Sequence, residues 1–177
     1  MKKCRIASLW LDGCSGCHMS LLDMDHGIID LAGSIEWVYG PLVDARIFPE
    51  AVDITFVEGA VSYDRDIRDL LHIRRCTRTL VSFGDCAVTA NVPGMRNAFS
   101  LPDVLHRSYV ENSDGDNGLP KGAVPGLLAR VRPVHEIVMV DIFLPGCPPP
   151  TTAIAHTLAS LLAGTMPALE TTSRFGA

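Results

Sequence analysis

LWLDGCSGCHMSLLD, residues 9–23, joins an apolar run to a helix-like pattern through a turn that contains two cysteines. The apolar run ends at Gly13, and the helical spacing of apolar residues begins almost at once. A buried strand that turns directly into a helix indicates an α/β fold. Cys14 and Cys17 stand in the turn, where they could form a redox disulfide, half of a metal site or neither.

Apolar and amphipathic segments alternate along the rest of the chain. We expect strands at 5–11, 35–40, 53–59, 78–86 and 135–147, and helices at 18–33, 62–76 and 151–164. Such alternation, with nearly continuous apolar strands, is typical of a parallel sheet covered by helices on both faces. Residues 93–125 break the pattern with prolines and the polar run SDGDNG, so a long irregular loop is predicted there.

Composition narrows the class of protein. The chain has 177 residues, of which 47% are hydrophobic, and this predicts a single domain over residues 1–177. The net charge of −5 argues against nucleic acid or an anionic membrane surface as the main partner. We find no signal peptide and no run of the ~18 to 20 apolar residues that a membrane helix needs, so we expect a cytoplasmic protein. Six cysteines then favour reduced thiols or metal ligands over disulfides.

Four of the cysteines follow predicted strands. Cys14 and Cys17 come after the first strand, and Cys86 and Cys147 end two later ones. Because the carboxyl ends of parallel strands meet at one edge of a sheet, these four thiols are expected to lie together. Such a set suits zinc or an iron–sulfur cluster. Flanking glycines favour the cluster, since they let the backbone approach a bulky inorganic core, and zinc sites more often combine two close pairs.

Other interpretations of the cysteines remain. A thioredoxin-like pair would account for the first two and leave Cys86 and Cys147 unexplained. A zinc-stabilised interaction module without redox activity is a second alternative. Burial in the core is the common fate of a single cysteine, and we assign Cys4 and Cys76, which lack flanking glycines, to this structural class.

Four motifs together resemble a known family: GCSGCHMSLLD (13–23), VEGAV (57–61), GDCA (84–87) and LPGCPP (144–149). Their order and spacing are similar to those of the small subunit of NiFe hydrogenases, in particular the cytoplasmic NAD-reducing type. The resemblance implies a flavodoxin-like α/β fold, with a parallel sheet, helices on both faces and long irregular loops. It also implies one 4Fe–4S cluster, proximal to the NiFe site, and by motif position its ligands are Cys14, Cys17, Cys86 and Cys147.

The resemblance further implies an electron relay between the NiFe site of a large subunit and iron–sulfur and flavin diaphorase subunits that reduce NAD⁺. The NiFe centre, FMN and NAD then belong to partner subunits, and no residue of this chain is catalytic. A cluster-carrying subunit of a complex I-like quinone oxidoreductase is the alternative. Its first motif has adjacent cysteines, whereas Ser15 and Gly16 separate them here. FMN is not expected in this chain, because GCSGC takes the place of a phosphate-binding loop.

Several residues next to the motifs are candidates for supporting roles. Glu58 is expected beside the cluster, as a hydrogen-bonding group, a proton-path member or a loop cap. His18 is expected to contact the large subunit or to donate a hydrogen bond near the cluster, rather than to bind iron. Asp12 and Asp85 are expected to accept hydrogen bonds from loop amides. The sequence VTANV (88–92) replaces the Gly-Gly pair of related proteins and leaves the path of that loop open.

Overall fold

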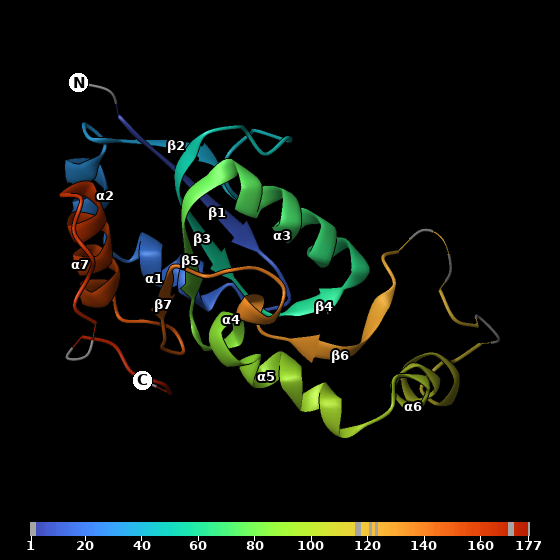
Figure 1. Ribbon diagram of the computed structural model, residues 1–177. Helices are drawn as coiled ribbons and strands as arrows, with labels where there is room; N and C mark the ends of the chain where they lie inside the picture. Colours follow the sequence, from blue (N-terminus) through green and yellow to red (C-terminus); the bar gives the residue numbers. More distant parts are fainter. Residues whose placement is uncertain (1–2, 116–117, 121, 123, 170–171, 177) are drawn as a thin grey trace.

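A five-stranded parallel sheet forms the centre of the computed structural model, which describes residues 3–115, 118–120, 122, 124–169 and 172–176 (Figure 1). Its strands are β1 (Cys4–Trp10), β2 (Ile35–Tyr39), β3 (Val52–Glu58), β5 (Thr77–Phe83) and β7 (Ile142–Leu144). They are arranged in the order β2-β1-β3-β5-β7, and every neighbouring pair is parallel. Counted along the chain this is the order 2-1-3-4-5 of flavodoxin-like folds. The predicted fold class is therefore confirmed.

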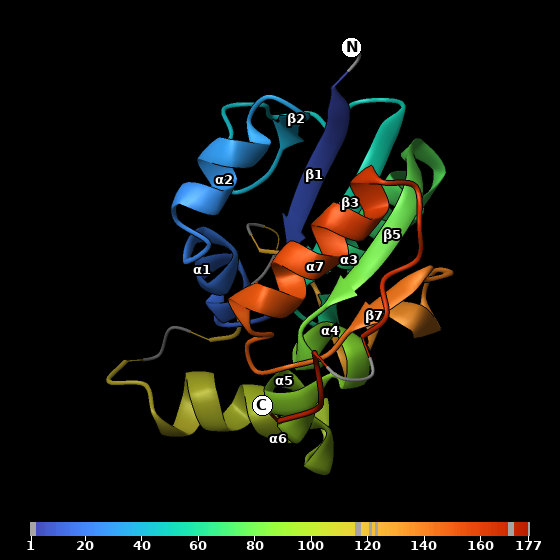
Figure 2. The same cartoon turned by 90° about the vertical axis from the view of Figure 1, so that its left-hand side faces the viewer.

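Helices cover both faces of the sheet. The helices α1 (Gly16–Leu22), α2 (His26–Leu31) and α7 (Thr151–Leu162) lie on one face, and α3 (Asp64–Cys76) lies on the other (Figure 2). The remaining helices are α4 (Asp85–Thr89), α5 (Asn91–Gly94), α6 (Leu101–His106), the 3-10 helices η1 (Met95–Ala98) and η3 (Val134–Glu136), and the π-helix η2 (Arg107–Glu111). A second, antiparallel sheet pairs β4 (Val61–Tyr63) with β6 (Leu127–Arg132).

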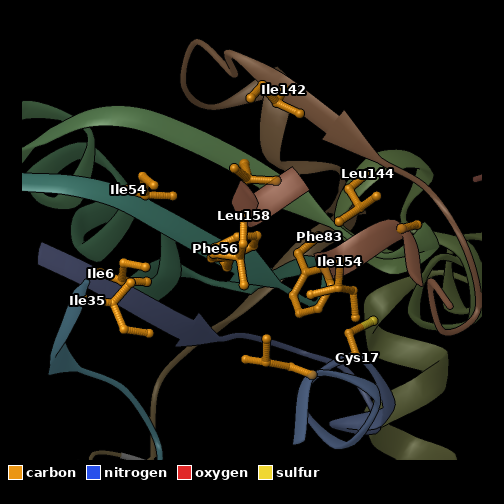
Figure 3. Close-up of a cluster of buried hydrophobic side chains, with 13 residues drawn as sticks. Ile6, Cys17, Ile35, Ile54, Phe56, Phe83, Ile142, Leu144, Ile154 and Leu158 are labelled. Carbon is orange, nitrogen blue, oxygen red and sulfur yellow. The ribbon is translucent and has the colours of Figure 1, made fainter. Parts of the chain in front are cut away.

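Two apolar clusters lie on opposite faces of the sheet. Ile6 and Ala7 of β1 belong to different clusters, because successive side chains of a strand point to opposite faces. In the first cluster, Phe56 of β3 packs with Leu158 of α7 (Figure 3). In the second, Leu70 of α3 is fully buried. Burial of both faces explains why the strands read as continuous apolar runs.

Two predicted elements differ in the structure. The helix expected at 18–33 is divided into α1 and α2, because Asp25 lies between them with a φ of +48°. The strand expected at 135–147 shrinks to β7. The Asp141 carboxylate accepts a hydrogen bond from the Leu80 amide at 2.7 Å, so a side chain occupies the place of a strand partner just before β7 begins. Val138, which looked like part of that strand, fills the second cluster instead.

The segment 93–125 also departs from the prediction of an irregular loop. Its first part forms η1, α6 and the π-helix η2. The Asn97 side chain accepts a hydrogen bond from the Val131 amide at 2.7 Å and donates to the Val131 carbonyl at 2.9 Å, which holds η1 against β6. Residues 116–117, 121 and 123 of the predicted loop lie outside the described residues. Among the described helices, none is both long and apolar enough to span a membrane.

Candidate metal centre

The four cysteines predicted as ligands meet at the carboxyl edge of the parallel sheet. Cys14 and Cys17 follow β1, Cys86 lies at the start of α4 after β5, and Cys147 follows β7. Burial raises the pKa of the Cys17 thiol well above its usual range, and negative charge on Glu58 and on the other three cysteines adds to this effect. Four thiols from three loops are thus close enough to influence one another.

Exposure differs among the four thiols. Cys17 is only 8% exposed and belongs to the first apolar cluster, where it lies beside Ile154 (Figure 3). Cys86 is partly buried, whereas Cys14 and Cys147 are exposed. Burial also raises the pKa of Cys86, and the Val92 amide opposes that shift. The site therefore has a buried inner side at Cys17 and an open outer side.

Two glycines allow the loops to approach each other. A Cβ atom on Gly84 would lie 2.2 Å from the Cys17 sulfur, and the residue has a φ of +84°, so no other residue fits there without displacing Cys17. Gly146, directly before Cys147, has a φ of +136° and no room for a Cβ atom against Pro149. These positions explain why the sequence places glycines beside the ligands.

N–H groups point at two of the sulfur atoms. The Gly16 amide donates to the Cys14 sulfur at 3.4 Å, and the Asn91 side chain donates to the Cys147 sulfur at 3.7 Å. The loop 88–92, whose path the sequence left open, therefore carries a donor to one of the sulfur atoms. Such hydrogen bonds stabilise negative charge on thiolates and tune the potential of a cluster.

Glu58 and His18 form a buried pair next to Cys17. Glu58 is 2% exposed, and its carboxylate accepts hydrogen bonds from the Cys17 amide at 3.3 Å and the His18 amide at 3.0 Å. It also contacts Nδ1 of the His18 ring. His18 is itself buried, so its side chain faces into this subunit and is not an open contact surface for another one. Glu58 thus fixes the start of α1, which carries Cys17.

The two aspartates near the ligands behave differently. Asp85 accepts a hydrogen bond from the Gly146 amide at 2.7 Å, as predicted for a loop-binding carboxylate. Asp12 instead accepts from the Ser62 hydroxyl group. A further tie is made by Ser20 of α1, whose hydroxyl donates to the Pro149 carbonyl at 2.6 Å. The ligand loops are therefore joined to one another by protein hydrogen bonds.

Sequence reasoning missed Asn91 and Ser20 as parts of the site. Neither stands in a motif, and only their position one turn or one short loop after a ligand could have drawn attention to them. By contrast, Cys4 and Cys76 lie where β1 begins and where α3 ends before β5, at the amino edge of the sheet. The structure keeps these two cysteines apart from the other four, in agreement with the structural role predicted for them.

The donor set fits an iron–sulfur cluster. The four thiols come with N–H groups aimed at sulfur, and glycines clear the space beside them. Within the described residues, no group of three or more His, Cys, Asp and Glu side chains is placed to hold a single metal ion. Metal analysis of the purified protein distinguishes a cluster from the zinc alternative.

Comparison with known proteins places the chain in a family. Residues 14–161 match the family described as NADH ubiquinone oxidoreductase, 20 Kd subunit. The chain belongs to this family. The matched region begins at the first candidate ligand, Cys14, and includes the other three.

Within this family, the chain is similar to subunits of hydrogenases. It is 38% identical over 167 residues to the NAD-reducing hydrogenase HoxS subunit delta of Cupriavidus necator, with 92% of this chain and 80% of that protein covered. It superposes with a TM-score of 0.93 and 36% identity on a crystal structure of an NAD⁺-reducing NiFe hydrogenase, covering 98% and 99% of the two chains. The resemblance to NiFe hydrogenase small subunits is confirmed.

A more distant relative differs in length. It is a subunit of the F420-non-reducing hydrogenase vhu of Methanocaldococcus jannaschii, and it is 32% identical to this chain over 169 residues. That alignment covers 94% of this chain but 59% of the relative. The chain thus spans little more than half of this archaeal member, while it spans nearly the whole of the NAD⁺-reducing chain of known structure.

Proposed function

We propose that this chain is the electron-transfer small subunit of an NAD-linked NiFe hydrogenase. In this proposal Cys14, Cys17, Cys86 and Cys147 bind one 4Fe–4S cluster. The observation that carries it is the meeting of four thiols at one sheet edge, with N–H donors on their sulfur atoms. The similarity to two NAD-reducing hydrogenases supports the assignment to this type.

A 4Fe–4S cluster in this place supplies one-electron transfer. The chain's own residues hold and tune it. Glu58 fixes the backbone of Cys17 and His18 through two hydrogen bonds. The amide of Gly16 and the side chain of Asn91 place positive dipole ends against Cys14 and Cys147, which favours the more negative, reduced state. No side chain acts as a nucleophile or general base.

The partners follow from the same proposal. Electrons arrive from the NiFe site of a large subunit and leave towards iron–sulfur and flavin diaphorase subunits, which reduce NAD⁺. The exposed thiols Cys14 and Cys147 mark the open side of the site, where a partner would approach. FMN and NAD are assigned to those partners and not to this chain, and the complex is expected in the cytoplasm.

The complex I-like alternative shares the family of this chain, whose description names NADH ubiquinone oxidoreductase. The turn between the first two cysteines favours the hydrogenase. Ser15 has a φ of +65° and the next amide, that of Gly16, donates to the Cys14 sulfur. Adjacent cysteines would lack this two-residue turn.

The cluster is tested by anaerobic purification of the complex with analysis of iron, sulfide and zinc. About four irons and four sulfides per chain of this subunit are expected beyond those assigned to the other subunits. To isolate this contribution, the wild type is compared with a Cys14→Ser/Cys86→Ser double variant. Stoichiometric zinc without iron would contradict the redox role.

The enzyme class is tested by what co-purifies. A nickel-containing large subunit and hydrogen-dependent reduction of NAD⁺ by the complex are expected. A quinone-linked membrane complex without hydrogen oxidation would instead support the complex I-like alternative.

A further inference from the structure

The segment that follows α7 returns to the ligand loops. Its Gly176 amide donates to Oδ2 of Asp85 at 2.8 Å, and the Ser173 hydroxyl donates to the Pro145 carbonyl. Figures 1 and 2 both show the C-terminal end of the chain near α4 and β7. Residues 172–176 thus contact the loops of two ligands, Cys86 and Cys147, although neither loop is near them in the sequence.

Asp85 is the point at which these contacts meet. Its side chain is only 4% exposed, and its two carboxylate oxygens accept from different segments, Gly146 at 2.7 Å and Gly176 at 2.8 Å. Its own amide donates to the Gly146 carbonyl at 2.9 Å. A buried carboxylate is costly unless its oxygens are hydrogen-bonded. Here both are, so the three segments are held together through one side chain.

The loop of Cys147 needs such support. It leaves β7, which has three residues and lies at the edge of the sheet, with β5 as its strand neighbour. The backbone around Cys147 is therefore held less firmly than Cys17, which lies in α1 and is buried in the first apolar cluster. The two hydrogen bonds between Asp85 and Gly146 extend the pairing of β5 and β7 by one step, up to the residue before Cys147.

The returning segment is itself anchored. Leu169 packs against the first apolar cluster, and the amides of Thr172 and Ser173 donate to its carbonyl at 3.1 and 3.0 Å. The segment is thus fixed to the core at one end and to Asp85 at the other.

We propose that residues 172–176 form a clasp that locks the Cys86 and Cys147 loops together, with Asp85 as the positioning residue at its centre. This inference rests on the proposed function, because it concerns retention of the proposed cluster. The clasp keeps Cys86 and Cys147 at a set separation and slows the opening through which iron would be lost.

The test compares variants of the whole anaerobically purified complex. We measure the rate at which an iron chelator bleaches the cluster absorbance, and the EPR spectrum of the reduced cluster. Asp85→Ala and a chain ending at Leu169 are expected to lose iron about tenfold faster than the wild type, as the loss of one to two hydrogen bonds implies. Asp85→Asn retains one acceptor oxygen and is expected to fall between them.

Two controls separate the clasp from general stability. Arg174→Ala alters an exposed residue of the same segment and should leave the rate unchanged. Leu161→Ala, in α7, removes packing against the first cluster and should lower the melting temperature without changing the EPR spectrum. If Asp85→Ala and the shortened chain bleach at the wild-type rate with an unchanged spectrum, the clasp is wrong.

A failure of the proposed function gives a different result. In that case the Cys14→Ser/Cys86→Ser variant contains as much iron as the wild type. The clasp is then judged by hydrogen exchange of the Gly146 amide, which should be protected in the wild type and exchange about tenfold faster in Asp85→Ala. Equal exchange in both proteins would overturn the clasp independently.

Discussion

Cysteines lie at both edges of the parallel sheet, but the groups that surround them differ. At the carboxyl edge, Cys14, Cys17, Cys86 and Cys147 stand in turns with glycines and N–H donors around them. At the amino edge, Cys4 begins β1 and Cys76 packs into the second apolar cluster. Burial raises the pKa of the thiol in both of these amino-edge residues, as it also does for Cys17 and Cys86, so the two edges differ in the groups around the thiols and not in this shift.

The difference lies in the backbone and not in the residue type. At the carboxyl edge each strand turns into a loop or a short helix, so free amides gather there, whereas carbonyl groups end the helices at the opposite edge. A thiolate is stabilised by the former and repelled by the latter. A cysteine thus becomes a candidate ligand through its place in the topology.

The largest effect expected from this comparison separates Cys86 from Cys76. Cys86→Ser removes a proposed ligand and should abolish or severely reduce the iron of this subunit. Cys76→Ser changes a thiol of the second apolar cluster and should leave the iron content unchanged. Iron and sulfide analysis of the two purified complexes measures the contrast.

The opposite pattern would break the distinction between the edges. Full iron in Cys86→Ser, or its loss in a folded Cys76→Ser complex, would mean that position at the carboxyl edge does not select the ligands. Circular dichroism of both variants shows whether each one is folded.

The second prediction concerns the buried carboxylate of the carboxyl edge. Glu58→Ala leaves the amides of Cys17 and His18 without an acceptor, and each buried unsatisfied group costs about 1–3 kcal/mol. We expect a lower melting temperature and less iron per chain, with Glu58→Gln less affected because one acceptor oxygen remains. Glu36→Gln on β2, where the carboxylate is exposed, is the matched control. Equal iron in Glu58→Ala and the wild type would show that this carboxylate does not support the Cys17 turn.

The sequence predicts the carboxyl edge better than the rest of the molecule. The parallel direction of the strands follows from apolar runs separated by helices, and the meeting of the cysteines follows from that direction. The paired amides of Cys17 and His18 could not be predicted, because the pattern VEG shows only that Glu58 ends a strand. Its hydrogen bonds depend on where the turn after β1 places the Cys17 and His18 amides.

Two of the failures of prediction have one cause in common, which is a side chain that replaces a backbone partner. Asp141 accepts the Leu80 amide and shortens the last strand, while Asn97 pairs with the backbone of Val131 and organises the segment expected to be irregular. The periodicity of apolar residues does not reveal where a side chain takes the place of a backbone hydrogen-bond partner. The role of Asn91 was missed for the same reason, since a single amide side chain has no pattern.

The third prediction tests whether burying a carboxylate lowers the free energy of unfolding at a position away from the cysteines. Burial raises the pKa of Asp66, although the Ser62 and Tyr63 amides oppose the shift. The native state then binds the proton more tightly than the unfolded state, so the contribution of Asp66 to stability is greatest at low pH. It is lost as the pH rises through the native pKa.

Asp66→Asn should remove this pH dependence. The free energy of unfolding of the variant, relative to that of the wild type, should increase from about pH 4 upwards, by about 1.4 kcal/mol for each unit of raised pKa. Urea denaturation at several pH values measures the difference. Asp30→Asn alters an exposed carboxylate of α2 and serves as the control. A constant difference across this pH range would show that the native pKa of Asp66 is not raised.

The smallest expected effect concerns the donor to the Cys147 sulfur. Asn91→Ala removes an N–H group that favours the reduced, more negative cluster, so the reduction potential should fall by on the order of 20 mV while iron content stays unchanged. A redox titration followed by EPR measures the potential, and Asn112→Ala, an exposed residue after the π-helix, is the control. A potential equal to that of the wild type would mean that the contact between Asn91 and Cys147 does not persist once the cluster is bound. A fall would show that side chains, as well as free backbone amides, give the carboxyl edge its preference for thiolates.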